Sequence, residues 1–131
     1  MMSLGVSVLI DLFGVTDPRP HQADWWERTL EDAVRVAGLT EIGLLAHQFP
    51  DQLHPGAGGL GHERPGGATA VALLAESHIS VHTWPEFGRV LVDILTCGSN
   101  MDVDAVADLI EKSVPHTDMV VTRVPRGGDH E

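Results

Sequence analysis

The sequence predicts an α+β fold, a two-layer sandwich in which two helices cover one face of a mainly antiparallel sheet, in the order β-α-β-β-β-α-β. Three observations support this prediction. Short segments rich in Val, Leu and Ile alternate with polar residues, as half-buried strands do. Two longer segments have apolar residues spaced three and four apart, as amphipathic helices do. Only short turns separate three successive strand segments, which indicates an antiparallel meander.

The N-terminal half alternates between the two kinds of element. A first strand is predicted over residues 5–13. Apolar residues then recur at helical spacing from 22 to 37, and Gly38 follows where a C-terminal cap glycine belongs. A second strand is predicted over about 41–49. The segment 50–67 is so rich in glycine and proline that we expect a long loop without regular structure.

The C-terminal half completes the sheet. The strands of the meander are predicted at 68–75, 78–84 and 89–97. Asn100 or Asp102 can cap a helix over about 103–113, and a last strand at 117–124 precedes a polar tail that we expect to be disordered. Because both helices lie on one face of the sheet, the apolar residues of the other face need a partner surface. We therefore expect a homodimer through the sheets, with four α/β/β/α layers.

Length, charge and cysteine content limit the possible functions. A chain of 131 residues with 43% hydrophobic residues can build one core, so residues 1–131 are predicted to form a single domain. The net charge of -11 would repel a phosphate backbone, so nucleic acid is not an expected partner. Cys97 is the lone cysteine, which fits a reducing, cytoplasmic location. The first strand contains Asp11 and has no basic leader, so neither a signal peptide nor a membrane anchor is expected.

Two patterns invite a binding function that we do not favour. Gly56, Gly58 and Gly61 have the G-x-G-x-x-G spacing of dinucleotide sites, but the residues that follow cannot open a helix. His78 and His82 would share one face of a strand and could hold a metal ion with a third histidine, yet no zinc motif accompanies them. A histidine-based metal-binding module stays a minor alternative, and no metal is predicted.

Ser77 offers a more specific chemistry. Histidines stand one and five residues after it, and a serine nucleophile needs such a base. No Gly-x-Ser-x-Gly turn surrounds it, which disfavours a hydrolase. A serine can instead attack the carbonyl of its own preceding peptide bond and form an ester. Elimination of that ester breaks the chain after Glu76, and the residue left behind hydrolyses to a pyruvoyl group.

Five stretches of the chain together resemble a known family. The densest are AESHISVHTWPE at 75–86 and VDILTCG at 92–98, and the shorter ones are SLG at 3–5, HQFP at 47–50 and GAT at 67–69. They resemble the prokaryotic S-adenosylmethionine decarboxylases, which are self-processing and pyruvoyl-dependent. These enzymes supply the aminopropyl donor for spermidine and other polyamines.

The resemblance implies self-cleavage between Glu76 and Ser77, giving a β chain of residues 1–76 and an α chain of residues 77–131. Ser77 would become the pyruvoyl group, with which the substrate amine forms a Schiff base. The pyruvoyl group then accepts the electrons released as carbon dioxide departs, as pyridoxal does elsewhere, so no added cofactor is expected.

The resemblance also implies the roles of individual side chains. His82 would be the base of processing, and Thr69 would support ester formation. Cys97 would donate a proton to the substrate carbon after decarboxylation, although a lone cysteine is more often a small buried hydrophobe. The residues expected to line the substrate site are Phe49, Trp84 and Glu86. An aromatic face attracts a sulfonium or an adenine, and a carboxylate accepts hydrogen bonds from ribose hydroxyls.

Two departures from the family pattern leave alternatives open. Family members pass almost directly from His-x-Phe-x-Pro to Gly-x-Ser or Gly-x-Thr, whereas a longer segment intervenes here. If Phe49 keeps the aromatic place, S-adenosylmethionine is the natural substrate. If Glu63 takes that place, its carboxylate would suit the cationic end of ornithine or arginine. A regulatory relative that never cleaves and acts only as a dimer partner is a further, less favoured alternative.

Strand geometry raises one difficulty for this mechanism. Ser77 and His82 are five residues apart, so a straight strand places their side chains on opposite faces. Either the chain bends near Ser77 or the two residues meet in some other way.

Overall fold

The computed structural model describes residues 4–55, 61–97 and 101–129, with only the backbone for residues 52–55 and 61–64. Within these residues the chain forms eight strands, two α-helices and two short 3-10 helices. The strands are β1 (Gly5–Phe13), β2 (Glu41–Gln48), β3 (Gln52–Pro55), β4 (Gly61–Arg64), β5 (Ala68–Leu74), β6 (Ser77–Trp84), β7 (Arg89–Cys97) and β8 (Asp118–Arg126). The helices are η1 (Arg19–His21), α1 (Ala23–Ala37), η2 (Pro85–Phe87) and α2 (Val103–Ser113).

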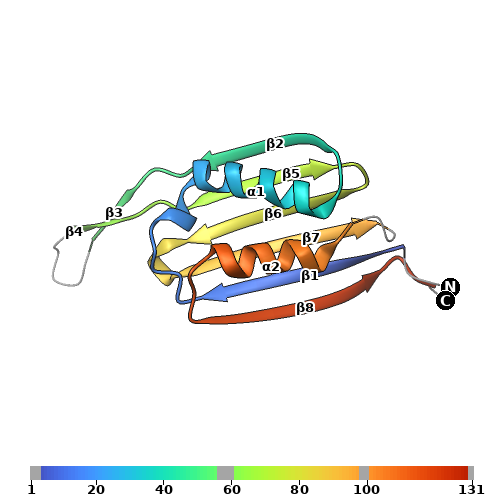
Figure 1. Ribbon diagram of the computed structural model, residues 1–131. Coiled ribbons are helices and arrows are strands. Elements are labelled where there is room, and N and C mark those ends of the chain that lie inside the picture. Colours follow the sequence, from blue (N-terminus) through green and yellow to red (C-terminus); the bar gives the residue numbers. More distant parts are fainter. Residues whose placement is uncertain (1–3, 56–60, 98–100, 130–131) are drawn as a thin grey trace.

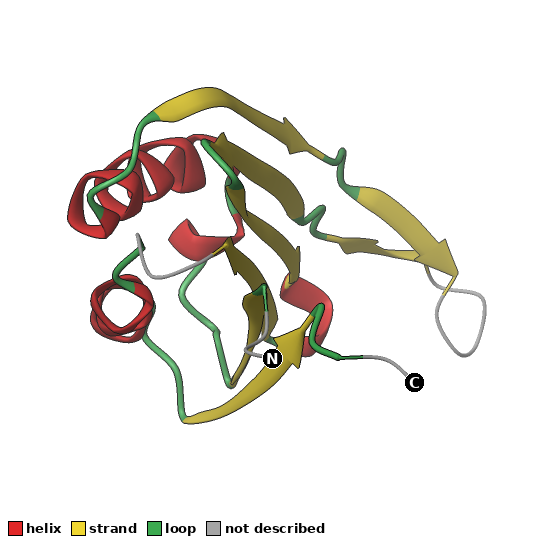
Figure 2. Ribbon diagram, turned by 90° about the vertical axis from the view of Figure 1, so that its right-hand side faces the viewer, coloured by secondary structure: helices red, strands yellow, loops and turns green. Residues whose placement is uncertain are grey.

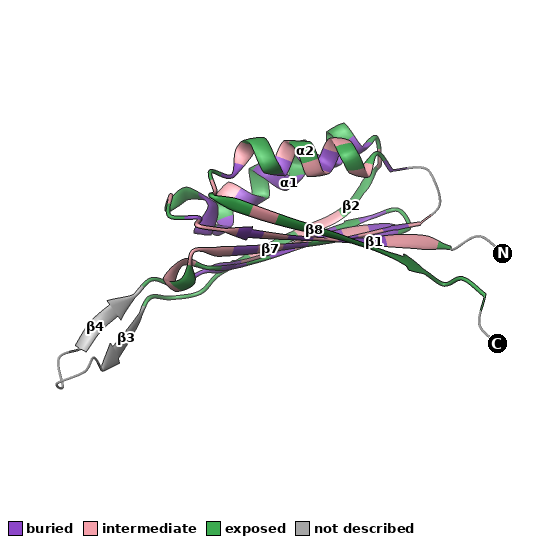
Figure 3. Cartoon of the chain, turned by 90° about the horizontal axis from the view of Figure 1, so that it is seen from below, coloured by how far each residue is buried: buried purple, intermediate pink, exposed green. Residues whose placement is uncertain are grey.

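Six strands form one antiparallel sheet in the order β2-β5-β6-β7-β1-β8 (Figure 1). Both α-helices lie on the same side of this twisted sheet (Figure 2). No described element covers the other side, which we call the open face (Figure 3). The open face carries the odd-numbered residues of β1, β5 and β7 and the even-numbered residues of β6. The predicted α+β, two-layer fold class is confirmed.

The hydrophobic core lies between the sheet and the helices. Every second residue of the central strands is buried there, as the alternation of the sequence predicts. Fully buried members from strands and helices include Val8, Ile10, Ile79, Val92, Trp26, Leu30, Val106 and Ile110. Burial of one such side chain contributes about 1.5–3 kcal/mol, so this layer fixes which face of each strand is left for function.

Two residues that the sequence predicts as helix caps mark the end of α1 and the start of α2. Gly38 follows α1 in the left-handed conformation with φ of 76°, which glycine adopts without a steric penalty. The Asp102 side chain accepts a hydrogen bond from the Ala105 amide at 3.0 Å and so caps α2. Asn100, the alternative cap, lies outside the described residues.

The prediction of an irregular loop over 50–67 is wrong. β3 and β4 pair with each other in a separate two-stranded sheet, from Gln52 opposite Arg64 to Pro55 opposite Gly61. This ribbon projects beyond the end of the main sheet (Figure 1). Backbone amides and carbonyls make such pairs without a hydrophobic face, and a proline at a strand end leaves the ladder intact. Gly56 and Gly58 lie outside the described residues.

Two smaller expectations also need correction. The order β-α-β-β-β-α-β omits one strand, since four strands of the main sheet, β2, β5, β6 and β7, lie between α1 and α2, as the four strand ranges predicted there already require. The last strand continues past Val124, because Pro125 pairs with Val6 and Arg126 with Gly5.

Neither α-helix in the described part of the chain is long and apolar enough to cross a membrane.

Candidate functional site

The first group of candidate residues lies where β5 and β6 run side by side on the open face. Thr69 and His82 are directly opposite each other in the antiparallel register. The Thr69 hydroxyl and His82 Nδ1 are 3.0 Å apart, within hydrogen-bond distance. Their pairing gives the imidazole a fixed orientation on a face that solvent or a partner can reach. We call these two residues the Thr69–His82 pair.

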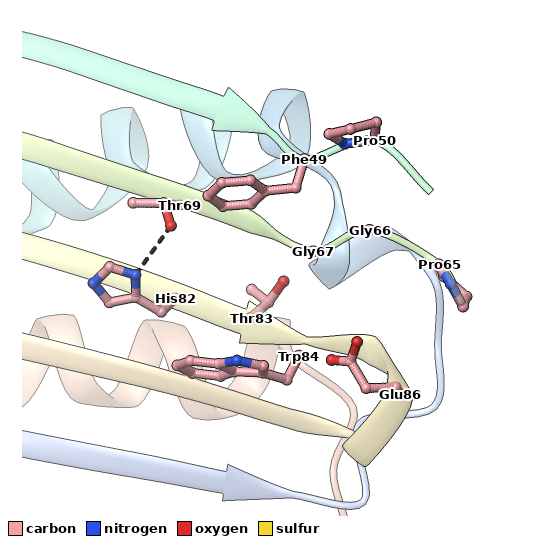
Figure 4. Close-up of a pocket in the computed structure, with 10 residues that line it drawn as sticks. All are labelled: Phe49, Pro50, Pro65, Gly66, Gly67, Thr69, His82, Thr83, Trp84 and Glu86. Carbon is pink, nitrogen blue, oxygen red and sulfur yellow. Dashed lines mark hydrogen bonds between the residues drawn. The ribbon is translucent and has the colours of Figure 1, made fainter. Parts of the chain in front are cut away.

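The Thr69–His82 pair forms one wall of a hollow of about 300 Å³, large enough for part of a small molecule (Figure 4). The residues that line it are Phe49, Pro50, Pro65, Gly66, Gly67, Thr69, His82, Thr83, Trp84 and Glu86. Figure 4 shows Phe49 and Trp84 on opposite sides of the hollow. Trp84 is 39% exposed and lies on the open face, so its ring is available to a ligand. All three residues expected in a substrate site therefore meet here.

Sequence reasoning missed the residue that shapes this hollow from behind, Gln48. Its side-chain carbonyl accepts a hydrogen bond from the Ala23 amide at 2.7 Å, at the start of α1. Its amide nitrogen lies 3.2 Å from the Gly66 carbonyl oxygen and 3.0 Å from that of Gly67. Gln48 thus ties the helix layer to the glycines in the wall of the hollow. Its place inside the stretch HQFP at 47–50 was the available signal.

A Gln48→Glu protein is expected to lose about 1–3 kcal/mol of unfolding free energy, because a carboxylate cannot donate to the Gly66 and Gly67 carbonyls. The loss should appear as a lower midpoint in urea unfolding. Gln22→Glu is the matched control, since Gln22 precedes α1 but makes no side-chain cap hydrogen bond. Equal midpoints for the two variants would contradict the role of Gln48.

The second group of candidate residues lies at the opposite end of β6. Ser77 is the first residue of β6, is 6% exposed and faces the covered side of the sheet. Its hydroxyl accepts a long hydrogen bond of 3.4 Å from the backbone amide of Cys97. Cys97 is the last residue of β7 and is half-buried, and strand alternation places its thiol on the open face. We call these residues the Ser77–Cys97 pair.

The peptide unit before Ser77 has an unusual conformation. Ala75 and Glu76 make the tight turn between β5 and β6, with Leu74 opposite Ser77. Glu76 has φ of 64°, and it is the one non-glycine residue with positive φ in the described part of the chain. A left-handed residue with a Cβ costs about 1–2 kcal/mol. The strained residue thus directly precedes the serine singled out from the sequence.

The two pairs are far apart within one chain. β6 is regular from Ser77 to Trp84, without a bend. Five residues of extended strand separate Ser77 from His82, which is about 16 Å. The two side chains also face opposite sides of the sheet, as alternation predicts. His82 therefore cannot act on Ser77 of the same chain in this conformation.

The metal alternative finds no geometric support. His78 and His82 do share the open face, but four residues of strand separate them by about 13 Å. Among the described residues no three His, Cys, Asp or Glu side chains gather closely enough to hold a metal ion. Glu63, the alternative substrate residue, lies in β4, and its side chain is outside the described part of the structure.

Comparison with known proteins identifies the family. Its model, S-adenosylmethionine decarboxylase, matches residues 6–127. The S-adenosylmethionine decarboxylase proenzyme of Picrophilus torridus is 35% identical over 126 residues, or 96% of this chain and 86% of that protein. The proenzyme of Aquifex aeolicus is 43% identical over 96 residues, or 73% of this chain and 61% of that protein. The crystal structure of the adenosylmethionine decarboxylase from Aquifex aeolicus matches with a TM-score of 0.80 at 34% identity, covering 100% of this chain and 97% of that one.

Fold and site together define a two-layer α+β protein with a pair of reactive side chains at each end of one central strand. The family model matches residues 6–127, a range that spans both pairs. The chain belongs to the S-adenosylmethionine decarboxylase family.

Proposed function

We propose that this protein is a self-processing, pyruvoyl-dependent S-adenosylmethionine decarboxylase, a carboxy-lyase that supplies the aminopropyl donor for spermidine synthesis. The observation that carries the proposal is the placement of Ser77 beside Cys97, directly after the strained residue Glu76, in a chain of this family. The lone cysteine agrees with a reducing, cytoplasmic location.

The pyruvoyl group would arise from Ser77. The Ser77 hydroxyl oxygen attacks the Glu76 carbonyl carbon, and the acyl group moves from nitrogen to oxygen. Removal of the Ser77 α-proton then expels the Glu76 carboxylate and leaves a dehydroalanine, which takes up water and releases ammonia. The strain at Glu76 favours leaving the peptide form, because cleavage frees that residue from its left-handed conformation.

The surroundings of Ser77 suit a pyruvoyl group. The Cys97 amide already donates to the Ser77 oxygen and could donate to a carbonyl oxygen in its place. When present, the group takes up the electron pair of the breaking carbon–carboxylate bond. The role of Cys97 is then to deliver a proton to the carbon that has lost carbon dioxide.

The hollow beside the Thr69–His82 pair supports S-adenosylmethionine as the substrate. Phe49 and Trp84 offer aromatic faces to a sulfonium or an adenine, and Glu86 offers a carboxylate to ribose hydroxyls. Ornithine and arginine have neither an adenine nor a ribose. The similar proteins named above are also S-adenosylmethionine decarboxylases, so the amino-acid alternative is not favoured.

A homodimer would unite the two pairs. The open face has exposed apolar side chains that need a cover, at Leu45, Phe49, Leu73, Trp84, Val120 and Val124. If two copies stack these faces antiparallel about a two-fold axis, the β6 start of one copy meets the β6 end of the other. Each site then combines Ser77 and Cys97 of one chain with Thr69 and His82 of its partner. In this arrangement His82 of one chain can act on Ser77 of its partner, so the separation of about 16 Å within one chain requires no bend in β6.

Purified protein is expected to release carbon dioxide from carboxyl-labelled S-adenosylmethionine on the order of a hundredfold faster than from ornithine or arginine. A site that hydrogen-bonds ribose and stacks on adenine discriminates strongly against substrates lacking both. The measurement is trapped radioactive carbon dioxide, with each substrate in a separate reaction. Faster release from either amino acid would overturn the choice of substrate while leaving the self-processing chemistry intact.

A further inference from the structure

A second cavity on the open face lies beside Cys97, at the other end of β6 from the Thr69–His82 pair. Its volume is about 180 Å³, and it is lined by Leu4, Gly5, Leu95, Thr96, Cys97, Arg126 and Gly127. Gly5 pairs with Cys97 on one side and with Arg126 on the other, so the three residues lie in one row across β7, β1 and β8. The sequence prediction ended the last strand before Arg126 and assigned this residue no role.

Gly5 leaves an open space between the Cys97 thiol and the Arg126 guanidinium. Gly5 has no side chain, and a Cβ added to it would lie 2.0 Å from the Thr96 carbonyl oxygen, so only glycine fits there. Cys97 and Arg126 are two strand spacings apart, which is about 10 Å between their Cα atoms. An arginine side chain is long enough to bring its guanidinium within a few ångströms of a small group held beside the thiol.

Arg126 differs from most other cations of this acidic protein. Within the described structure, the arginines that pair with a carboxylate are Arg19, Arg28, Arg35 and Arg123. Arg126 instead donates to the neutral Ser7 hydroxyl at 3.0 Å, which orients the side chain, and it forms no ion pair with a carboxylate of the described residues. The other arginine without a carboxylate partner there is Arg89, whose guanidinium lies over the Phe13 ring. Arg126 is thus the described cation that can receive an anion beside Cys97.

We propose that Arg126 binds the α-carboxylate of the substrate and holds it beside the Cys97 thiol until decarboxylation. This inference rests on the proposed function. The carbon that Cys97 protonates is the one that carries the carboxylate, so the carboxylate-binding group must lie close to the thiol. The planar guanidinium of arginine matches the two oxygens of a carboxylate better than any other side chain does.

The expected kinetic effect is specific, because the carboxylate loses its charge during the reaction. Carbon dioxide leaves as a neutral molecule, so Arg126 stabilises the bound substrate more than the transition state. Loss of Arg126 should therefore raise KM without lowering kcat. The decarboxylated product has no carboxylate, and its binding should not depend on Arg126.

Arg126→Gln tests this directly in the full-length, self-cleaved protein. We expect KM for S-adenosylmethionine to rise about tenfold to a hundredfold, with kcat no lower than that of the unchanged protein. The inhibition constant of the decarboxylated product should change by less than about twofold. Arg123→Gln is the matched control, because Arg123 lies on the same strand but pairs with Asp104 on the helix side. It should leave all three constants unchanged.

Several outcomes would overturn the proposal. Equal weakening of substrate and product binding would give Arg126 a general structural role, and an unchanged KM would give it none in binding. Arg126→Lys keeps the cation and should show an intermediate KM. If neither variant yields folded, cleaved protein, Arg126 serves folding or processing instead. Failure of the proposed function is recognised separately, because the unchanged protein would then release no carbon dioxide, and the present inference would fall with it.

Discussion

A Ser77→Ala protein is expected to remain one uncut chain and to release no detectable carbon dioxide, a loss of at least about a thousandfold. Alanine has no oxygen to attack the Glu76 carbonyl, so no ester forms and no pyruvoyl group arises. Denaturing gel electrophoresis should show a single band, and intact-mass measurement should give one chain of all 131 residues. The unchanged protein should instead give two fragments, residues 1–76 and 77–131.

Ser80→Ala is the matched control for this variant. Ser80 lies on the same strand three residues further on, is half-buried and faces the open side. It should cleave and turn over substrate like the unchanged protein. Urea unfolding tests whether the fold tolerates the loss of the Ser77 hydroxyl. Ser77→Ala should unfold at a urea concentration similar to that of the unchanged protein. Two results would contradict the mechanism. One is full activity of an uncut Ser77→Ala protein, and the other is an active protein without substitutions that is found only as an uncut chain.

Much of the fold follows from local patterns in the sequence. Helix α1 ends at Gly38 because its C-terminal cap needs a left-handed residue, and α2 begins after Asp102 because its first amides need an acceptor. Both signals are local and were predicted. The β3–β4 ribbon was not predicted, because its pairing depends on backbone hydrogen bonds between two segments with no apolar alternation.

The candidate site shows how small boundary errors hide a contact. The predicted strands 68–75 and 78–84 leave a turn of residues 76–77, which would pair Thr69 with Trp84. The structure begins the turn one residue earlier, at Ala75 and Glu76, and pairs Thr69 with His82. Moving the turn by one residue shifts the pairing by two. The resemblance had singled out both side chains, but only the register showed that they touch.

Arg126 was missed for a related reason. The residues after Val124 are polar, and polar ends of chains are usually disordered. Here they continue the edge strand, because β1 has amides and carbonyls left to pair as far as Gly5. An edge strand with one exposed face needs few apolar residues, so its end is poorly marked in the sequence. The contacts of the proposed dimer are likewise not marked in the sequence, since no intrachain pattern tells which part of one copy would meet which part of another.

Co-expression of Ser77→Ala and His82→Ala chains is expected to restore about a quarter of the activity of the unchanged protein, although each variant alone is inactive. In a two-fold dimer with shared sites, a mixed dimer has one site with both defects and one site with neither. Random pairing makes about half of the dimers mixed, and each has one working site of two. Activity should therefore appear together with cleavage of about one chain in four, measured on the affinity-purified mixture.

Ser77→Ala co-expressed with His78→Ala calibrates this measurement. His78 lies on the open face of β6 next to Ser77 in sequence, but it belongs to neither pair of reactive side chains. Chains with His78→Ala should supply a complete Ser77–Cys97 pair and a complete Thr69–His82 pair, so this mixture should give about half of full activity. If His82 served Ser77 of its own chain, the first mixture would give no activity, because no chain in it would have both residues. An activity of about a quarter in the first mixture would show that a second copy brings His82 to Ser77. No activity would show that a rearrangement within one chain brings together the two pairs, which lie about 16 Å apart along β6.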